Sequence, residues 1–202
     1  MVLFMKRDKA PKRRHADATK SSRISRADWI AAGLKVLAAK GIEWVRVEPM
    51  AKGLGVTKGS FYWHFTDRAA LYDAMLDKWR EIATRAIIAR VEQTAATPRE
   101  KIRQLIKLTT TSSEGARLDI AVRSWANHDD RAANAVAEIA RERLDYVVDL
   151  LESVGIKHAT AVVRAQIFYL TLIGSFFSLR RGQKLPKKQL WDELERLSVQ
   201  RT

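Results

Sequence analysis

From Ser25 to the end of the chain, apolar residues recur at the three- and four-residue spacing of an α-helix. The segments with this spacing are separated by residues that begin or end helices, such as Gly41, Thr97-Pro98 and Gly155. No stretch alternates between apolar and polar residues for long, and no Asn-Gly or Asp-Gly pair indicates a hairpin. The pattern therefore predicts an all-α fold.

The first expected helix begins at a capping box of Ser25 and Asp28 and ends at Gly41. Short helices at about 47–54 and 58–65 follow, separated by a turn at Gly55. The other expected helices run from Thr66-Asp67 to about Ala95, from Thr97-Pro98 to a break at Gly115, and then over about 117–127, 130–155, 158–181 and 187–200.

The chain carries 37 basic and 23 acidic residues, a net charge of +14, and residues 1–68 hold nine of these net charges. A basic balance of this kind favours polyanions, either nucleic acid or an acidic membrane surface, and its distribution points to the first third of the chain. Residues 1–22 are basic and have no apolar period. We expect them to form either an arm along DNA or a solubilising tail. Met5 is an alternative translation start.

Several classes of function are disfavoured by the composition. The chain has no cysteine, and its four histidines are not at metal-ligand spacings, so we expect neither a metal site nor a cofactor. We find no paired carboxylates, histidine-based triad or phosphate loop, so a small helical enzyme is a distant alternative. The N-terminus does not resemble a signal peptide, and the 13-residue apolar run 167–179 is shorter than the roughly 20 residues of a membrane span. We therefore expect a cytoplasmic protein with no membrane partner.

The three short helices and the tight turn before the third are typical of a helix-turn-helix, whose partner is double-stranded DNA. Val56, Phe61 and Phe65 are expected to hold the third helix against the first two. Gly59 permits close approach to DNA. The outward-facing candidates are Thr57, Lys58 and Ser60 for base edges or phosphate, and Tyr62 and His64 for phosphate. Trp63 is open between contact with DNA and packing on the next helix.

The segment Gly55-Val56-Thr57-Lys58-Gly59-Ser60-Phe61-Tyr62-Trp63-His64-Phe65, followed by Asp67-Arg68-Ala69-Ala70-Leu71, closely resembles the signature of the tetracycline-repressor (TetR) family. The resemblance covers about residues 25–76. It implies an all-α homodimer with a three-helix DNA-binding head and a larger helical domain that binds an effector and dimerises. The expected division is a basic arm at 1–22, a helix-turn-helix domain at 23–82 and an effector-binding and dimerisation domain at 83–202.

By the family pattern, Tyr62 and His64 look like phosphate contacts, and Arg68 replaces a usual lysine while keeping its charge. Arg46 replaces the usual hydroxyl cap of the second helix and offers a charge for phosphate. Gly53 replaces a longer residue, which weakens that helix. The predicted DNA-binding residues are Arg46, Thr57, Lys58, Gly59, Ser60, Tyr62, Trp63, His64 and Arg68.

The second half of the chain is less informative. In the resembled family the last two helices form a dimer interface, for which the candidates here are Phe168, Leu172, Ser175, Leu179, Trp191 and Leu194. The alternative is a monomer core. The candidates for binding an effector are Arg123, Trp125, Asn127, His128 and Tyr146. For Arg123 and Trp125 the alternative is a pair at the edge of the core.

The leading hypothesis is a homodimeric repressor that an unknown small-molecule effector releases from its operator. The alternatives are a DNA-binding regulator without effector control, or an activator. Each of these keeps the same helix-turn-helix and differs in what the second half of the chain does.

Overall fold

The computed structural model describes residues 24–111, 113–180 and 187–199, and throughout this part the chain is helical, as predicted. The basic segment 1–22 lies outside the described residues. The elements are α1 (Arg26–Lys40), a 3-10 turn (Ile42–Trp44), α2 (Val47–Leu54), α3 (Lys58–Tyr62), α4 (Arg68–Arg80), a π-helical turn (Glu81–Arg85), α5 (Ala86–Thr94), α6 (Pro98–Thr111), α7 (Ser113–Ala126), α8 (Asp130–Ser153), α9 (His158–Arg180) and α10 (Lys187–Val199).

Short-range signals determine most of these boundaries. Ser25 and Asp28 form the predicted capping box at the start of α1. The carboxylates of Asp67 and Asp129 accept hydrogen bonds from backbone N–H groups in the first turns of α4 and α8. Gly41 ends α1 with a φ of 101°, a left-handed region that favours glycine. The capping residues thus separate the helices largely where the sequence indicates.

Three details differ from the prediction. The third helix ends at Tyr62, three residues before Phe65. Gly115 lies inside α7 and does not break a helix there, because the buried face of α7 outweighs the roughly 1 kcal/mol cost of one glycine. The long helix expected to run to Ala95 is interrupted by the π-helical turn.

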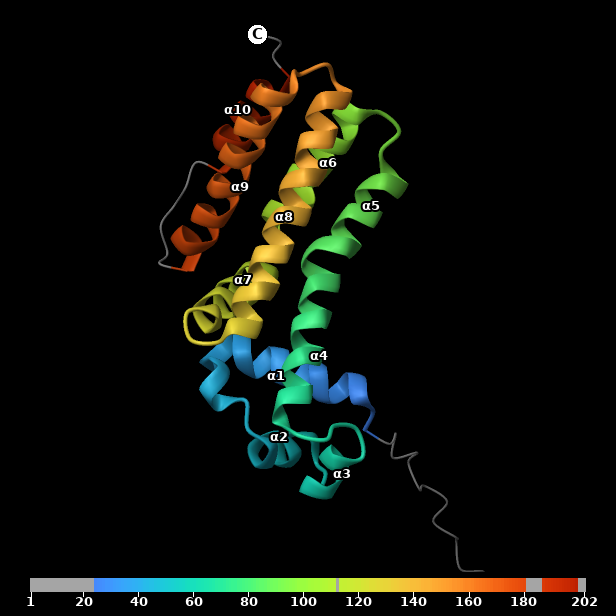
Figure 1. Cartoon of the computed structure of the whole chain (residues 1–202), viewed down its shortest axis with the longest axis vertical. Coiled ribbons are helices and arrows are strands. Elements are labelled where there is room, and N and C mark those ends of the chain that lie inside the picture. Colours follow the sequence, from blue (N-terminus) through green and yellow to red (C-terminus); the bar gives the residue numbers. More distant parts are fainter. Residues whose placement is uncertain (1–23, 112, 181–186, 200–202) are drawn as a thin grey trace, which may run out of the picture.

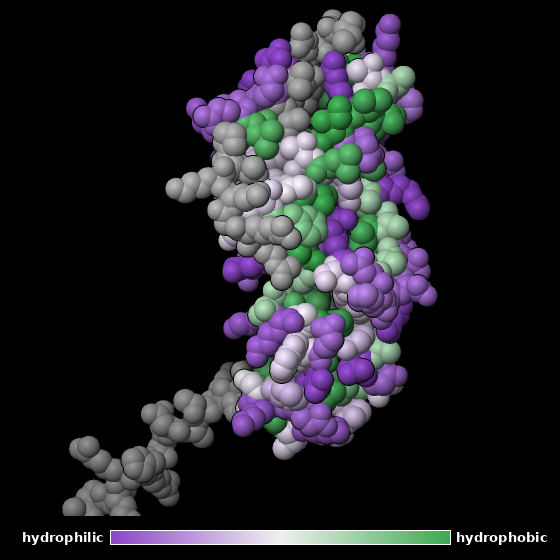
Figure 2. All heavy atoms as spheres, turned by 90° about the vertical axis from the view of Figure 1, so that its left-hand side faces the viewer, coloured by the Kyte–Doolittle hydropathy of each residue, from purple (hydrophilic) through white to green (hydrophobic). Residues whose placement is uncertain are grey.

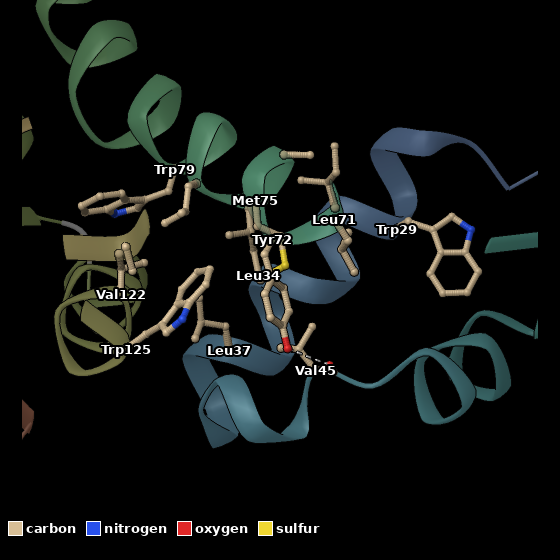
Figure 3. Packing of buried hydrophobic residues seen from close by; sticks show 14 of the residues in the cluster. Trp29, Leu34, Leu37, Val45, Leu71, Tyr72, Met75, Trp79, Val122 and Trp125 are labelled. Atoms are coloured by element: carbon tan, nitrogen blue, oxygen red, sulfur yellow. Dashed lines mark hydrogen bonds between the residues drawn. The ribbon is translucent and has the colours of Figure 1, made fainter. Parts of the chain in front are cut away.

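At one end of the molecule, α1 to α4 form the head, with α2 and α3 at its base (Figure 1). Its core contains Trp29, Leu37, Phe61 and Met75, each no more than 1% exposed. The same cluster continues into α7 and α8, where Trp125 packs edge-on against Tyr72 (Figure 3). The head therefore rests on the body through shared apolar packing.

The other helices form the body, which has its own apolar cluster supplied by α5 to α10. Helix α8 runs along much of the body beside α9 and carries buried residues at both of its ends (Figure 1). The helix formed by α4, the π-helical turn and α5 continues from the head into the body (Figure 1). A movement of this helix relative to α8 would therefore change how the head sits on the body.

One described helix, α9, is long and apolar enough over 158–178 to cross a membrane by length and composition alone. A third of this window is buried against the rest of the protein, and a single helix of this kind is weak evidence for a membrane span. Its exposed apolar residues are Val162, Val163, Ile167, Leu170 and Phe177. The face of the molecule on which α9 lies shows hydrophobic side chains gathered in its upper half (Figure 2).

Candidate DNA interface and ligand cavity

The turn between α2 and α3 depends on Gly55, which adopts a left-handed conformation with φ 71°. The next backbone N–H, that of Val56, returns to the carbonyl of Ala51 at 3.0 Å and closes the end of α2. Thr57 then occupies the N-cap of α3, and its side chain makes no capping hydrogen bond. The turn therefore presents the hydroxyl of Thr57 on an exposed surface at the start of α3.

Phe61 packs α3 against the other helices of the head, as the sequence predicts. Its ring is fully buried and lies 5.3 Å from the rings of both Trp29 and Phe65. Val56 packs against the same cluster. These contacts leave the opposite side of α3 exposed.

The exposed side carries the two most accessible aromatic rings near the turn. Tyr62 is 55% exposed and Trp63 is 84% exposed. The interpretation of Trp63 as a ring packed on the next helix is therefore wrong. Two exposed aromatic rings side by side form an apolar patch, and such patches are found at contact surfaces.

Lys58 does not project alone from the start of α3. Its Nζ donates to Oε1 of Glu48, in the first turn of α2, at 2.6 Å. This hydrogen bond lowers the pKa of Glu48 and raises that of Lys58, so both groups are charged at neutral pH. Glu48 was not among the predicted residues, although an acidic residue ten positions before the predicted base-reading lysine was a visible signal.

Three of the remaining predicted contacts have partners within the head. Nε2 of His64 lies 3.0 Å from the carbonyl oxygen of Ile24, so the half-buried ring ties the segment after α3 to the residue before the N-cap of α1. The Nε of Arg46 donates to the backbone carbonyl of Glu43 at 2.9 Å. Arg68 is exposed, with its guanidinium 5.5 Å from the centre of the Tyr72 ring. Each leaves part of its side chain available on the same end of the molecule.

A cavity of about 920 Å³ lies where the head meets the body. Ile30 and Leu34 of α1 supply one wall, while Trp79 of α4, Leu172 and Phe176 of α9 supply others. Its size lies in the upper part of the range for small-molecule pockets, and its walls are mainly apolar, as is usual for such sites.

Of the five residues predicted to bind an effector, only Tyr146 lines this cavity. Burial and the hydrogen bond from its hydroxyl to Glu92, at 2.7 Å, raise the pKa of Tyr146. Trp125 is buried in the head cluster, and Asn127 and His128 are exposed in the turn before α8. Arg123 is also absent from the wall, so this cavity brings together only one of the five predicted residues.

The polar part of the wall was not predicted. Asp119, only 2% exposed, accepts from Nε of Arg123 at 2.6 Å and from Nη2 of Arg143 at 3.1 Å. Burial opposes the charge of Arg123, but Asp119 outweighs it and holds the pKa of Arg123 above its usual value. The four-residue spacing of Asp119 and Arg123 was a visible signal, whereas nothing in the sequence indicates the contribution of Arg143 from another helix.

Four of the six predicted dimer residues point into the body of the subunit. Phe168, Leu172, Ser175 and Trp191 are at most 8% exposed, and the Phe168 and Trp191 rings pack edge-on inside the body. The side chains of Leu179 and Leu194 lie outside the described part of the chain. Helix α9 is apolar nearly all round, so its sequence did not show which side packs inward.

An all-α chain whose first helices form a helix-turn-helix is a member of the class of helical DNA-binding regulators. The model of the bacterial regulatory proteins of the tetR family matches residues 30–75. The HTH-type transcriptional regulator TtgR of Pseudomonas putida is 24% identical over 143 residues, which are 71% of this chain and 68% of the relative.

Solved structures show the same fold over most of both chains. A transcriptional regulator from Rhodococcus sp. Rha1 has a TM-score of 0.69 at 21% identity, covering 87% of this chain and 94% of that one. A TetR transcriptional regulator from Legionella pneumophila has a TM-score of 0.71 at 12% identity, covering 85% and 95%. Residues 30–75 therefore match the tetR-family regulators, and the chain as a whole is similar to DNA-binding transcriptional regulators in sequence and shares the fold of solved ones.

Proposed function

We propose that this regulator is a cytoplasmic, homodimeric repressor that leaves its operator when a small molecule fills the cavity between head and body. The observation that carries the proposal is the composition of the cavity wall. Residues of α1, within the DNA-binding head, line it together with residues of α6, α7, α8 and α9. A molecule bound there contacts the head and the body at once, so its binding energy can depend on how the two are arranged.

The domain division supports the same proposal. A head at 23–82 and a body at 83–202 meet within the π-helical turn Glu81–Arg85, which contributes Ile82, Ala83 and Thr84 to the cavity wall. A ligand therefore touches the junction through which α4 connects the two parts. Irregular turns of this kind often occur at functional positions in helices.

For the DNA interface, we assign sequence preference to Thr57, Lys58, Gly59 and Ser60 at the start of α3. Tyr62 and Trp63 supply exposed contact surface beside them. The charged and polar residues around this group are proposed to bind phosphate and position the head; they are Arg46, His64 and Arg68.

For the homodimer, we assign the interface to an exposed stripe on α9. Val163, Ile167, Leu170, Gly174 and Phe177 follow one another at alternating spacings of four and three residues, the repeat of a helix seam. A Cβ added at Gly174 would meet no atom within 4 Å, so the helix surface is open there and another helix can approach closely. These five residues, called the α9 seam below, replace the buried residues predicted from the sequence.

The α9 seam would join the bodies of two subunits so that their heads face successive major grooves. A helix-turn-helix dimer needs half-sites about 34–36 Å apart. A ligand that favours another arrangement of head and body changes this spacing in both subunits. DNA then favours one arrangement of head and body, and the ligand favours the other.

The first experiment identifies the operator and measures its release. The purified protein selects duplexes from a random-sequence pool, and fluorescence anisotropy then measures its affinity for the selected site. We expect a two-fold symmetric site that binds one dimer. A single asymmetric site bound by a monomer would contradict the proposal.

A second experiment distinguishes the alternatives. A thermal-shift screen with small apolar ligands finds those that stabilise the protein, and the anisotropy assay is repeated with each. Release from the operator is expected for ligands that fill the cavity. A regulator without effector control would retain its DNA affinity with every ligand, and an activator would raise transcription of a reporter placed downstream of the site.

A further inference from the structure

The polar corner of the cavity is organised around one arginine. Nη2 of Arg143, on α8, donates to the carbonyl oxygen of Ala83 at 3.1 Å, and its Nε donates to Oγ1 of Thr84 at 3.0 Å. Both acceptors belong to the π-helical turn between head and body. A π-helical turn shifts the usual hydrogen-bond register, and here Arg143 binds two of its oxygens.

The charges in this corner do not balance. Asp119 is the carboxylate that pairs with both Arg123 and Arg143, so one negative charge faces two positive charges in a part of the protein with little access to water. The side chain of Arg143 is only 14% exposed. A buried cationic group without a full counter-charge is unfavourable unless an anion joins it.

Arg143 also has unused hydrogen-bonding capacity. Its Nη1 is buried and has no hydrogen-bond partner. The indole Nε1 of Trp79, a residue of the same cavity wall, is also buried and unpartnered. Buried donors are nearly always satisfied, so two unsatisfied donors in the wall of one cavity indicate a missing acceptor.

The other charged residues in the cavity wall also favour an anionic ligand. Apart from Asp119, which is already paired with two arginines, the acidic residue in the wall is Glu114. The basic residues in the wall, besides Arg143, are Lys35, Lys78 and Arg90. Because the remaining wall is mainly apolar, the cavity suits a molecule with a large apolar body and one negative group.

We propose that the effector is an apolar molecule with a single anionic head group, such as a carboxylate, and that Arg143 binds this head group. The inference rests on the proposed function, since it names the ligand class of the same cavity. A carboxylate matches the fork of a guanidinium and can take up its Nη1 donors. Because Nη1 is buried, Arg143 has to turn toward the cavity to offer it, and this movement takes Nη2 and Nε away from Ala83 and Thr84 at the junction between head and body.

The test uses two pairs of probes that differ only in the head group. Dodecanoate is compared with dodecanol, and 2-naphthoate with 2-naphthamide, all below the concentrations at which they aggregate. Binding to the full-length protein is measured by thermal shift and isothermal titration calorimetry. We expect at least one anion to bind about tenfold more tightly than its neutral partner, a difference of ~1.4 kcal/mol.

A matched pair of variants locates the contact. Arg143→Gln and Arg123→Gln each remove one positive charge from the same carboxylate, but only Arg143 lines the cavity. We expect Arg143→Gln to lose the preference for the anion and Arg123→Gln to keep it within about threefold. Circular dichroism and cooperative urea unfolding show that both variants fold.

The inference is overturned if the neutral probes bind as tightly as the anions, if neither anion binds, or if Arg143→Gln keeps the full preference. Its failure is distinguishable from failure of the proposed function. Release of the operator by a neutral ligand supports the proposed function and overturns the anionic class. An anion that binds through Arg143 without changing operator affinity supports the class and overturns effector control.

Discussion

The head and the body of this regulator perform their tasks with residues that are distributed very differently along the chain. In the head, the residues proposed to contact DNA lie almost entirely within 46–68, on one turn and two short helices. In the body, Thr84, Asp119 and Arg143 meet at the cavity from positions 24 to 59 residues apart. A function made of neighbouring residues is visible in a sequence, whereas one assembled by helix packing is visible only in three dimensions.

The largest expected effect distinguishes residues that pack the core of the head from residues that contact DNA. Phe61→Ala should lower the free energy of unfolding by about 3–5 kcal/mol, because a fully buried ring leaves a cavity between Trp29 and Phe65. Urea unfolding followed by circular dichroism measures the loss. DNA affinity should fall together with stability.

Trp63→Ala is the matched variant two residues further on. Its ring is 84% exposed, so its removal should change the unfolding free energy by no more than about 0.5 kcal/mol. Operator affinity should nevertheless fall about tenfold, or ~1.4 kcal/mol. A Trp63→Ala protein with normal operator affinity would remove this ring from the proposed interface.

The second prediction concerns the α9 seam. Val163→Glu places a charge in the seam, and Val162→Glu makes the same change at an adjacent exposed valine outside it. A carboxylate buried in an interface without a partner costs about 3 kcal/mol or more, so Val163→Glu should yield monomers with weak operator binding. Analytical ultracentrifugation measures the oligomeric state.

Val162→Glu is expected to remain a dimer. Leu170→Glu, at the middle of the seam, should dissociate the dimer at least as fully as Val163→Glu. Equal dissociation by Val162→Glu and Val163→Glu would show that the interface follows another face of α9.

These comparisons also explain which parts of the fold were predictable. The starts of α1 and α8 follow from side-chain caps, and the ends of α1 and α2 follow from glycines, all of which act on their immediate neighbours. No residue near the π-helical turn in the sequence indicates its irregular register. The contacts that accompany this register come from Arg143 on α8, which is distant in the sequence. Whether the side chain of Phe168 points into the body depends on which helices pack around α9. The spacing of apolar residues in α9 does not decide this, because the helix is apolar nearly all round.

A third, smaller effect is expected at the start of the recognition helix. Glu48 neutralises Lys58 and adds a negative charge near the proposed path of the phosphates. Glu48→Gln should therefore raise affinity for DNA of any sequence by about threefold to tenfold and make binding more salt-dependent, because one more cation can replace a counterion. Anisotropy titrations at several salt concentrations measure both quantities.

The matched control is Glu43→Gln, which removes the same charge from an exposed residue of the 3-10 turn before α2. Its effect on the salt slope should be smaller, because Lys58 keeps its partner. Identical slopes for the two variants would show that the pair between Glu48 and Lys58 does not limit DNA binding.

The smallest effects come from two glycines that contrast the head with the body. A Cβ added at Gly53 in α2 or at Gly174 in α9 meets no atom within 4 Å of the same subunit. Alanine at either position should therefore stabilise its helix by about 0.5–1 kcal/mol, measured by thermal unfolding. Gly53→Ala should leave dimerisation unchanged.

Gly174→Ala should instead weaken the dimer, because the added methyl group occupies space that we assign to the helix of a second subunit. The dimer dissociation constant from ultracentrifugation is the deciding measurement. If Gly174→Ala left this constant unchanged, the two α9 helices would not approach closely at Gly174, and the seam would have to be centred elsewhere. If Gly174→Ala raised the dissociation constant while Gly53→Ala left it unchanged, the dimer contact would lie in the body at Gly174 and not in the head at Gly53.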